Sequence, residues 1–334
     1  MIAPISYSSS TGPYDAAAAH STAQASDDRA LLHLGRRLQA DGYQFITPTP
    51  LTHQRVVSRA DNAPAVDMRG IFGWSRPFEA QVFEAAEWQA LQQAGIIVKA
   101  HGRWHSTVRW STLGSLLLAH SAFPTDGTDS VFFGPDTYRF AAVIDDCLRQ
   151  RFAPIRRAVD IGCGSGAGAL LVALARHDAE VLAVDINPRA LRLSAVNAEL
   201  AEAVNVSVYH SDVLGGVDGS FDLILANPPY MRDSQQRAYR HGGGELGEAL
   251  SLRILREALP RLECDGTLVL YTGVAIVDGR DPFLEAARSS LTSEAFGWTY
   301  RELDPDVFGE ELEKPGYERV ERIAAVVLTV TRLN

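Results

Sequence analysis

The sequence has few cysteines, a deficit of positive charge and no long run of apolar residues. Its three cysteines are scattered and odd in number, which favours a reducing, cytoplasmic setting and argues against disulfides and against a metal site. Lysine and arginine number 31 against 41 for aspartate and glutamate, so the formal net charge is −10. Nucleic-acid-binding proteins usually carry a basic face, so this balance argues against nucleic acid as a partner. No stretch reaches the roughly 18 to 20 apolar residues of a membrane helix, and we expect neither a signal peptide nor membrane contact.

Composition divides the 334 residues into three parts. Residues 1–25 are rich in serine, alanine, glycine and proline, which predicts a flexible N-terminal segment or, alternatively, a lid over a pocket. Residues 26–125 start with an amphipathic pattern that Ser26 can cap, and end in a β-hairpin pattern at 96–110. They predict an N-terminal helical, winged-helix-like domain. A polar run then opens the third part, 126–334. The helices expected in the second part are 26–42, 52–60 and 83–94.

The third part alternates between strand and helix patterns. Its strands are continuous apolar runs, which is typical of a parallel sheet covered by helices on both faces. Two last strands, at 298–303 and 322–331, are expected to form an antiparallel pair. The predicted fold class is therefore α/β, a doubly wound, Rossmann-like sheet with an antiparallel final strand. The other expected strands are 158–161, 180–184, 204–209, 221–226 and 267–271, with helices at 167–176 and 188–203.

A glycine-rich turn follows the first of these strands. Ligands of such sheets bind outside the carboxyl ends of the strands, and the chain there reads Asp160-Ile161-Gly162-Cys163-Gly164-Ser165-Gly166-Ala167-Gly168. Glycines let the backbone bend sharply and approach a ligand closely. Gly162, Gly164 and Ala167 also fit a dinucleotide-binding pattern. The carboxylate of Asp160, however, would repel a pyrophosphate and attract an ammonium group, so we expect a ligand with a positive amino group.

Three further segments come to the same edge. Asp185 ends the next strand, where a carboxylate can accept both hydroxyls of a ribose. Asp212, beside the apolar Val213, suits an adenine amino group and its ring, although a simple turn role is equally open to it. Asn227-Pro228-Pro229-Tyr230 ends the following strand. Its two prolines remove two backbone donors and leave a stiff, extended peptide that carries one amide and one aromatic ring.

Together these segments resemble the class I S-adenosylmethionine-dependent methyltransferases over about residues 131–333. The Asn227–Tyr230 motif is similar to the branch that methylates amino or amide nitrogens, which includes release-factor glutamine methyltransferases and adenine-amino DNA methyltransferases. The segment Phe133-Gly134-Pro135-Asp136-Thr137-Tyr138 looks like the one that closes over the cofactor in the glutamine enzymes. The resemblance implies S-adenosylmethionine as the cofactor. With the residues above, it gives a predicted cofactor site of Phe133, Thr137, Asp160, Gly162, Gly164, Gly166, Asp185, Ile186, Asp212, Val213 and Asn227.

The predicted catalytic residues are Asn227, Pro228 and Tyr230. An amide or aryl-amine lone pair is delocalised and must be steered toward the methyl carbon at about 3 Å. The side-chain carbonyl of Asn227 and the backbone carbonyl of Pro228 can each accept one N–H of the acceptor. The Tyr230 ring can stack on a planar substrate and face the sulfonium, a contact worth roughly 0.5–2 kcal/mol. Positioning and electrostatics would carry the reaction, without a general base of unusual pKa.

Two other functions stay open. Azetidine-2-carboxylate synthases are similar to this branch, yet they cyclise S-adenosylmethionine itself and release methylthioadenosine; Asn227 and Tyr230 could serve that reaction too. We favour N-methyl transfer to a small molecule or a protein side chain, because Asp160 favours a charged amine and cyclisation needs a neutral one. A non-catalytic module that binds S-adenosylmethionine or DNA would have no need of Asn227 and Tyr230. The N-terminal part is longer than in the glutamine enzymes, so their substrate does not carry over.

Overall fold

The computed structural model describes the chain except residues 1–13, 60–63, 152, 234–236, 238 and 334, and describes residues 14–26 by their backbone alone. The helices are α1 (Tyr14–Ala40), α2 (Pro50–Val57), α3 (Met68–Phe72), α4 (Ala85–Gln93), α5 (Pro135–Gln150), α6 (Ala167–Ala175), α7 (Pro188–Leu200), α8 (Ala249–Ala258) and α9 (Pro282–Ser290). The strands are β1 (Ile97–Ala100), β2 (Arg103–Ser106), β3 (Val108–Leu113), β4 (Leu116–Ser121), β5 (Arg157–Ile161), β6 (Glu180–Asp185), β7 (Val206–His210), β8 (Phe221–Ala226), β9 (Leu262–Val277), β10 (Phe296–Asp304) and β11 (Val320–Arg332). None of the helices described is long and apolar enough to cross a bilayer.

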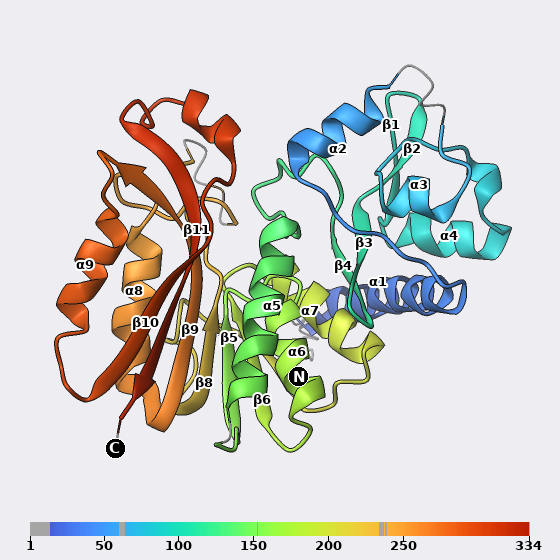
Figure 1. Ribbon diagram of the computed structural model, residues 1–334. Helices are drawn as coiled ribbons and strands as arrows, with labels where there is room; N and C mark the ends of the chain where they lie inside the picture. The colour runs from blue at the N-terminus through green and yellow to red at the C-terminus, as the bar shows by residue number, and fades with distance from the viewer. Residues whose placement is uncertain (1–13, 60–63, 152, 234–236, 238, 334) are drawn as a thin grey trace, which may run out of the picture.

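A seven-stranded sheet in the order β10-β11-β9-β8-β5-β6-β7 forms the centre of the molecule. The strands β5 to β9 pair in parallel, and β11 runs antiparallel to both β9 and β10. Helices α5, α6 and α7 cover one face, while α8 and α9 cover the other (Figure 1). The predicted α/β class, the doubly wound sheet and the antiparallel final strand are confirmed.

The predicted parallel strands are all present, but several helices were missed. Helix α5 follows Gly134, with Pro135 at its first turn, where proline fixes a helical φ and has no N–H to leave unpaired. Helices α8 and α9 pack their apolar sides on the same core cluster as the sheet. Strand β9 continues to Val277, beyond the predicted 267–271, because β11 pairs with it from Thr267 to Val277.

The N-terminal part differs from the prediction at both ends. Helix α1 begins at Tyr14 and not at Ser26, because the alanine-rich run after Asp15 favours helix. The flexible segment predicted for 1–25 is therefore helical from Tyr14 onward, and its first 13 residues lie outside the described part of the chain. The expected hairpin at 96–110 is in fact β1 and β2, and β3 starts a second hairpin with β4. The winged-helix-like character stays a prediction.

The N-terminal part and the sheet domain share one core rather than meeting at a linker. Leu31 and Trp110 of the N-terminal part lie in one buried cluster with Leu193 and Leu200 of α7, and α1 lies beside α7 (Figure 1). A Cβ on Gly35 would lie 2.7 Å from the Trp110 ring and 2.8 Å from Leu200. This glycine therefore allows α1 to approach α7 closely.

The fully buried Asn197 fastens this contact to the glycine-rich turn. Its Oδ1 accepts from the Ala119 backbone N–H at 2.8 Å, and its Nδ2 donates to the carbonyls of Ala119 at 3.0 Å and Ser165 at 2.8 Å. One side chain thus joins β4 to the turn that precedes α6. Backbone groups that lose such a buried partner cost more than the bond itself contributed.

Replacement of Asn197 by alanine is expected to lower the free energy of unfolding by about 3 kcal/mol, because three buried backbone groups lose their hydrogen-bond partner. Urea denaturation followed by circular dichroism measures this change. Glu199→Ala is the matched control, since Glu199 is exposed on the same helix and its side chain forms a surface ion pair with Arg36. It should change stability by less than about 0.5 kcal/mol. Equal effects of the two substitutions would contradict the role given to Asn197.

Candidate functional site

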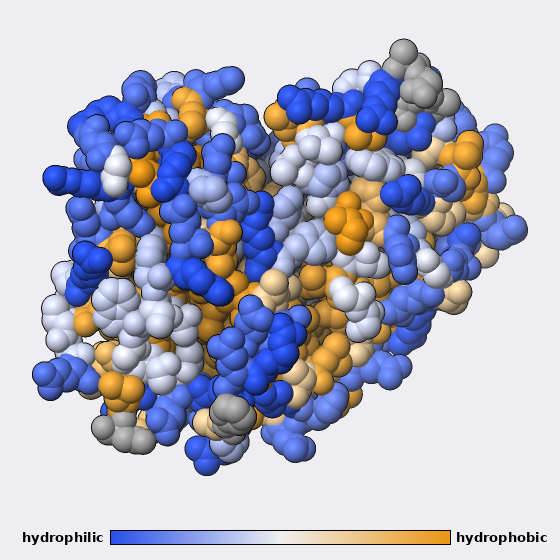
Figure 2. All heavy atoms as spheres, viewed as in Figure 1, coloured by the Kyte–Doolittle hydropathy of each residue, from blue (hydrophilic) through white to orange (hydrophobic). Residues whose placement is uncertain are grey.

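A cavity of about 220 Å³ lies at the carboxyl ends of β5, β6 and β8. On its side of the molecule, the surface is hollowed between the lobe that carries β11 and the lobe that carries α2 (Figure 2). The cavity joins segments from the N-terminal part, the glycine-rich turn and the end of β8. Among its lining residues are the predicted Thr137, Asp160, Gly162, Gly164, Asp185, Ile186, Asp212, Val213, Asn227, Pro228 and Tyr230.

The glycine-rich turn has the backbone shape that only glycine adopts easily. Gly162, Gly164 and Gly166 have φ values of +68°, +56° and +80°, in the left-handed region where a Cβ is strained. The amides of Gly162 and Cys163 donate to the Val184 carbonyl at 2.8 and 3.0 Å, which holds the turn against β6. Gly166 is absent from the cavity lining and instead caps α6. Its predicted part in cofactor binding stays a prediction.

Asp160 is a buried carboxylate on the cavity wall. It is 3% exposed, and it accepts the Ala169 amide at 2.9 Å. A Cβ on Gly168 would lie 2.7 Å from its Oδ2, so this glycine makes room for the carboxylate beside α6. Burial, with a further contribution from the charge of Asp185, raises the pKa of Asp160 to about 7. A cationic group in the cavity would restore its ionised form.

The other two aspartates of the predicted cofactor site differ in their surroundings. Asp185 accepts the amides of Gly164 at 3.0 Å and Asn187 at 2.9 Å, and burial raises its pKa. Asp212 is exposed, and Arg253 of α8 binds its two oxygens at 2.8 and 3.0 Å. A ligand at Asp212 would therefore share this carboxylate with Arg253, which the sequence reasoning did not foresee. The pair is exposed and so contributes little to stability.

The end of β8 presents Asn227 and Tyr230 to the cavity. Asn227 is half-buried, and within the described part of the chain its side-chain amide makes no hydrogen bond. Tyr230 is buried, and its hydroxyl donates to the carboxylate of Asp136. A Cβ on Gly273 of β9 would lie 2.1 Å from the Tyr230 ring. The absence of a side chain at Gly273 thus gives the ring its place.

Asp136 lies in the segment from Phe133 to Tyr138, but it was not among the predicted site residues. Its carboxylate accepts the hydroxyls of Tyr230 and, at 2.7 Å, of Tyr271, and it lies 3.2 Å from a guanidinium nitrogen of Arg139. It is 4% exposed and lines the cavity, and burial raises its pKa. The only sequence signal was an acidic residue just after a proline at a helix start.

The structure places the predicted Phe133 outside the cavity lining, and its part in cofactor binding stays a prediction. Its ring stacks on His120 at 4.9 Å and lies edge-on to Tyr138 at 5.3 Å, so it belongs to the core and not to the cavity wall. Val131 and Phe132 line the cavity instead. A run of two phenylalanines gives no indication of which ring faces inward, because that depends on the path of the segment before α5.

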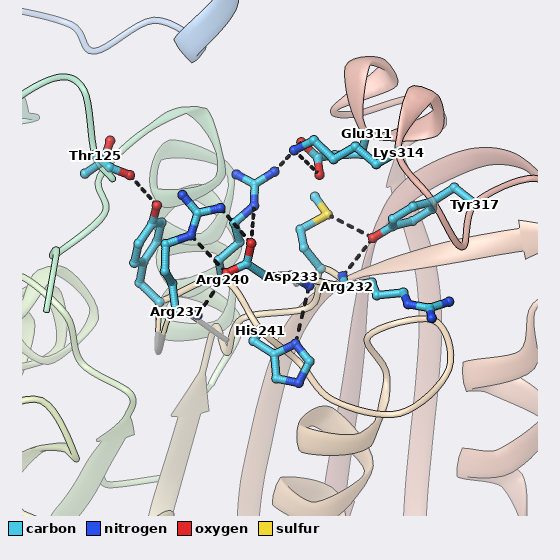
Figure 3. Close-up of polar contacts among 11 residues, drawn as sticks. Thr125, Arg232, Asp233, Arg237, Arg240, His241, Glu311, Lys314 and Tyr317 are labelled. Atoms are coloured by element: carbon cyan, nitrogen blue, oxygen red, sulfur yellow. Dashed lines mark hydrogen bonds and ion pairs between the residues drawn. The ribbon is translucent and has the colours of Figure 1, made fainter. Parts of the chain in front are cut away.

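The loop after Tyr230 is tied to both sides of the cavity (Figure 3). Arg237 donates to Asp233 through its backbone amide at 2.9 Å and its side chain at 2.9 and 2.6 Å, and this holds the pKa of Asp233 at about 2. Arg240, which lines the cavity, pairs with the buried carboxylate of Glu311, and Glu311 also accepts from Lys314 at 2.7 Å.

On the other side of the cavity, the hydroxyl of Tyr239 donates to the Thr125 carbonyl. The Tyr239 ring lies nearly parallel to that of Phe132, with centroids 6.3 Å apart and an interplanar angle of 12°. The loop is therefore fixed to the segment before α5 as well as to the segment before β11. The rings of Phe132 and Tyr239 and the paired Arg240 thus contribute to the cavity wall.

Comparison with known proteins identifies the domain that carries this cavity. Residues 141–273 match the family model of the Methyltransferase small domain. The release factor glutamine methyltransferase of Deinococcus radiodurans is 31% identical over 165 residues, 48% of this chain and 51% of that protein. The ribosomal protein uL3 glutamine methyltransferase of Xanthomonas campestris pv. campestris is 35% identical over 130 residues, 36% of this chain and 42% of that protein.

A ribosomal RNA methyltransferase is also similar to this domain. The ribosomal RNA small subunit methyltransferase C of Chromohalobacter salexigens is 38% identical over 115 residues, 34% of this chain and 31% of that protein. The chain spans about half the length of the first of these relatives and less of the others. The predicted resemblance to the S-adenosylmethionine-dependent N-methyltransferases, and the predicted cofactor, are confirmed for this domain.

The chain's own residues fit this cofactor. The glycine turn offers backbone without side chains, Asp185 lies where ribose hydroxyls are expected, and Asp160 offers a buried carboxylate to the methionine ammonium group. These positions of the chain would hold the cofactor through hydrogen bonds and one ionic contact.

Binding of S-adenosylhomocysteine, which has the same ammonium group, is expected to release up to one proton below pH 7. The free protein holds that proton on Asp160 below its pKa of about 7, and the bound cation favours the carboxylate. Affinity should therefore rise with pH through about 7 and level off above it. Calorimetry in buffers of different ionisation enthalpy measures the released proton.

Asp160→Asn should abolish this release, whereas Asp178→Asn should leave it intact, because Asp178 is exposed away from the cavity. Equal binding heats in all buffers for the wild-type protein would contradict the pairing of Asp160 with the ammonium group.

Proposed function

We propose that this chain is an S-adenosylmethionine-dependent methyltransferase that modifies the side-chain amide nitrogen of glutamine in a protein. The observation that carries the proposal is the end of β8. There the Asn227 amide, which has no hydrogen-bond partner among the described residues, and the anchored Tyr230 ring line the same cavity as Asp160 and Asp185. The names of the relatives from Deinococcus radiodurans and Xanthomonas campestris support a glutamine acceptor. The net charge of −10 argues against an RNA acceptor.

The chain's residues position the acceptor nitrogen. When bound, S-adenosylmethionine supplies an electrophilic methyl group. The Asn227 side-chain oxygen and the Pro228 carbonyl each accept one N–H of the acceptor amide, and this orients the nitrogen lone pair. The hydroxyl of Tyr230 donates to Asp136, which fixes the ring. Gly273 has no side chain to occupy the space that the ring fills. Because Pro228 and Pro229 stiffen the turn, these groups are arranged before the acceptor arrives.

Asn227→Ala is expected to lower kcat by about 100-fold, because the acceptor nitrogen loses one of its two orienting contacts. Its affinity for S-adenosylhomocysteine should change by less than about threefold, since the ammonium and ribose contacts remain. The assay measures transfer of a labelled methyl group to purified release factor and ribosomal protein uL3. Tyr209→Phe, an exposed change on β7, is the control and should leave kcat unchanged.

Unchanged turnover in Asn227→Ala would show that this residue does not orient the acceptor nitrogen. A protein that binds S-adenosylhomocysteine but methylates none of the acceptors would favour the non-catalytic binding module.

Incubation with S-adenosylmethionine alone separates methyl transfer from cyclisation. A methyltransferase without acceptor positions no nucleophile, so the cofactor should remain intact at its spontaneous rate of decay. Mass spectrometry of the small molecules provides the measurement, with heat-denatured protein as the control. Methylthioadenosine formed over many turnovers, with a four-membered imino acid, would overturn the proposal in favour of cyclisation.

A further inference from the structure

The two carboxylate oxygens of Asp136 have different sets of partners. Oδ1 accepts the Tyr271 hydroxyl at 2.7 Å and Nη1 of Arg139 at 3.2 Å. Oδ2 accepts the Tyr230 hydroxyl and has no second hydrogen-bond partner among the described residues. Because Oδ1 already accepts two donors, a proton added to Asp136 goes to Oδ2. That proton occupies the oxygen to which the Tyr230 ring is anchored.

The anchor of Tyr230 therefore requires the ionised form of Asp136. Burial raises the pKa of Tyr230 and of Tyr271 above the usual value, so both hydroxyls keep their protons and can donate. A carboxylate only accepts, whereas a protonated carboxyl group is itself a donor at one oxygen. Protonation of Oδ2 would place two donors against each other and release the ring from its hydrogen bond.

Burial opposes the ionised form of Asp136. The residue is 4% exposed, and burial raises the pKa of its carboxyl group, while the two phenol hydroxyls and the charge of Arg139 lower it. Within the described residues, Arg139 is the one cation that forms an ion pair with this carboxylate. A positive charge at such a distance favours the ionised acid more strongly than a neutral hydroxyl does.

Arg139 is held in place from its other side. Its Nη2 donates to Oδ2 of Asp304 at 2.7 Å, and Asp304 is the last residue of β10. The two nitrogens of one guanidinium thus bind two acids, one in the first turn of α5 and one at the edge of the sheet. The planar fork of arginine suits such a bridge. Its direction toward Asp136 is therefore set by the fold.

We propose that Arg139 is a positioning residue for methyl transfer: it keeps Asp136 ionised and thereby holds the Tyr230 ring in the orientation in which it faces the acceptor. Arg139 is not among the residues that line the cavity, so it acts through Asp136. This role rests on the proposed function, because the ring matters only if an acceptor lies against it. Cofactor affinity should not depend on Arg139, since the glycine-rich turn and Asp185 are not part of these contacts.

The charged and titratable groups around Asp136 come from four elements. They are Arg139 of α5, Tyr230 after β8, Tyr271 of β9 and, behind Arg139, Asp304 of β10. The wall of the same cavity also contains Asp160, Asp185, Asp212 and Arg240. At saturating S-adenosylmethionine the ammonium group keeps Asp160 ionised, so the pH dependence of kcat does not report its titration.

The first experiment measures kcat against pH at saturating S-adenosylmethionine, by transfer of a labelled methyl group to release factor and uL3. Arg139→Gln removes the charge, so the pKa of Asp136 rises and the acid limb moves to higher pH. On that limb, kcat at a given pH should fall roughly tenfold, while the alkaline plateau changes by less than about twofold. Arg139→Met should give the same shift, and Arg139→Lys, which keeps the charge, should restore most of the wild-type profile.

Arg149→Met is the matched control. Arg149 lies on the same helix and pairs with Asp146 at the same spacing of three residues, but both side chains are exposed. This change should leave the profile where it is. Equal acid limbs in the wild type and Arg139→Gln would overturn the positioning role.

The second experiment does not need turnover. Carbon NMR of protein labelled at the aspartate carboxyl groups follows the titration of Asp136, with Asp136→Asn to assign its signal. The midpoint should be higher in Arg139→Gln than in the wild type, and an unchanged midpoint would overturn the control of Asp136 by Arg139. Absence of methyl transfer by the wild type to every acceptor would instead overturn the proposed function, and with it the positioning role, whatever the midpoint shows.

Discussion

The carboxylate of Asp136 is the contact on which the Tyr230 side of the cavity depends. It is buried at the start of α5 and accepts the hydroxyls of both Tyr230 and Tyr271. These bonds join the segment before the sheet to the ends of β8 and β9. A buried carboxylate needs such donors to offset its lost hydration, and two rigid phenols supply them at little cost in side-chain entropy. The Tyr230 ring is fixed as a consequence, with Gly273 providing the space that it fills.

The N-terminal part is a structural component of the site and not a separate attachment. Its residues share a core with α7, and Asn197 connects β4 to the backbone of the glycine-rich turn. Pro50 of α2 and the segment before α5 then form part of the cavity wall. Because interiors are close-packed, a change in how this part packs on α7 is transmitted to the turn that faces the cofactor. The matched family model spans residues 141–273 and so does not include Pro50.

The cations of this acidic protein have distinct positions around the site. Arg240 is paired with the buried Glu311, and Arg253 is paired with the exposed Asp212. The first pair fixes the loop after Tyr230 between two walls of the cavity, whereas the second is screened by solvent. Arg109 alone among these three is buried and has no carboxylate partner within the described residues.

The sequence by itself determined the strands of the parallel sheet and several of the cavity's polar residues. Apolar runs, glycine turns and the two prolines after Asn227 are local signals, and parallel strands bring their carboxyl ends to one edge whatever the rest of the chain does. Asp160, Asp185 and Asn227 could therefore be named from their positions at the carboxyl ends of strands.

Only the tertiary structure decided the contacts between distant segments. Asp136 and Tyr230 lie 94 positions apart, and Arg253 reaches Asp212 from a helix that was not predicted. Phe132, and not Phe133, faces the cavity because of the path that the chain takes into α5. No local pattern encodes these pairings, because each follows from how the helices pack on the finished sheet.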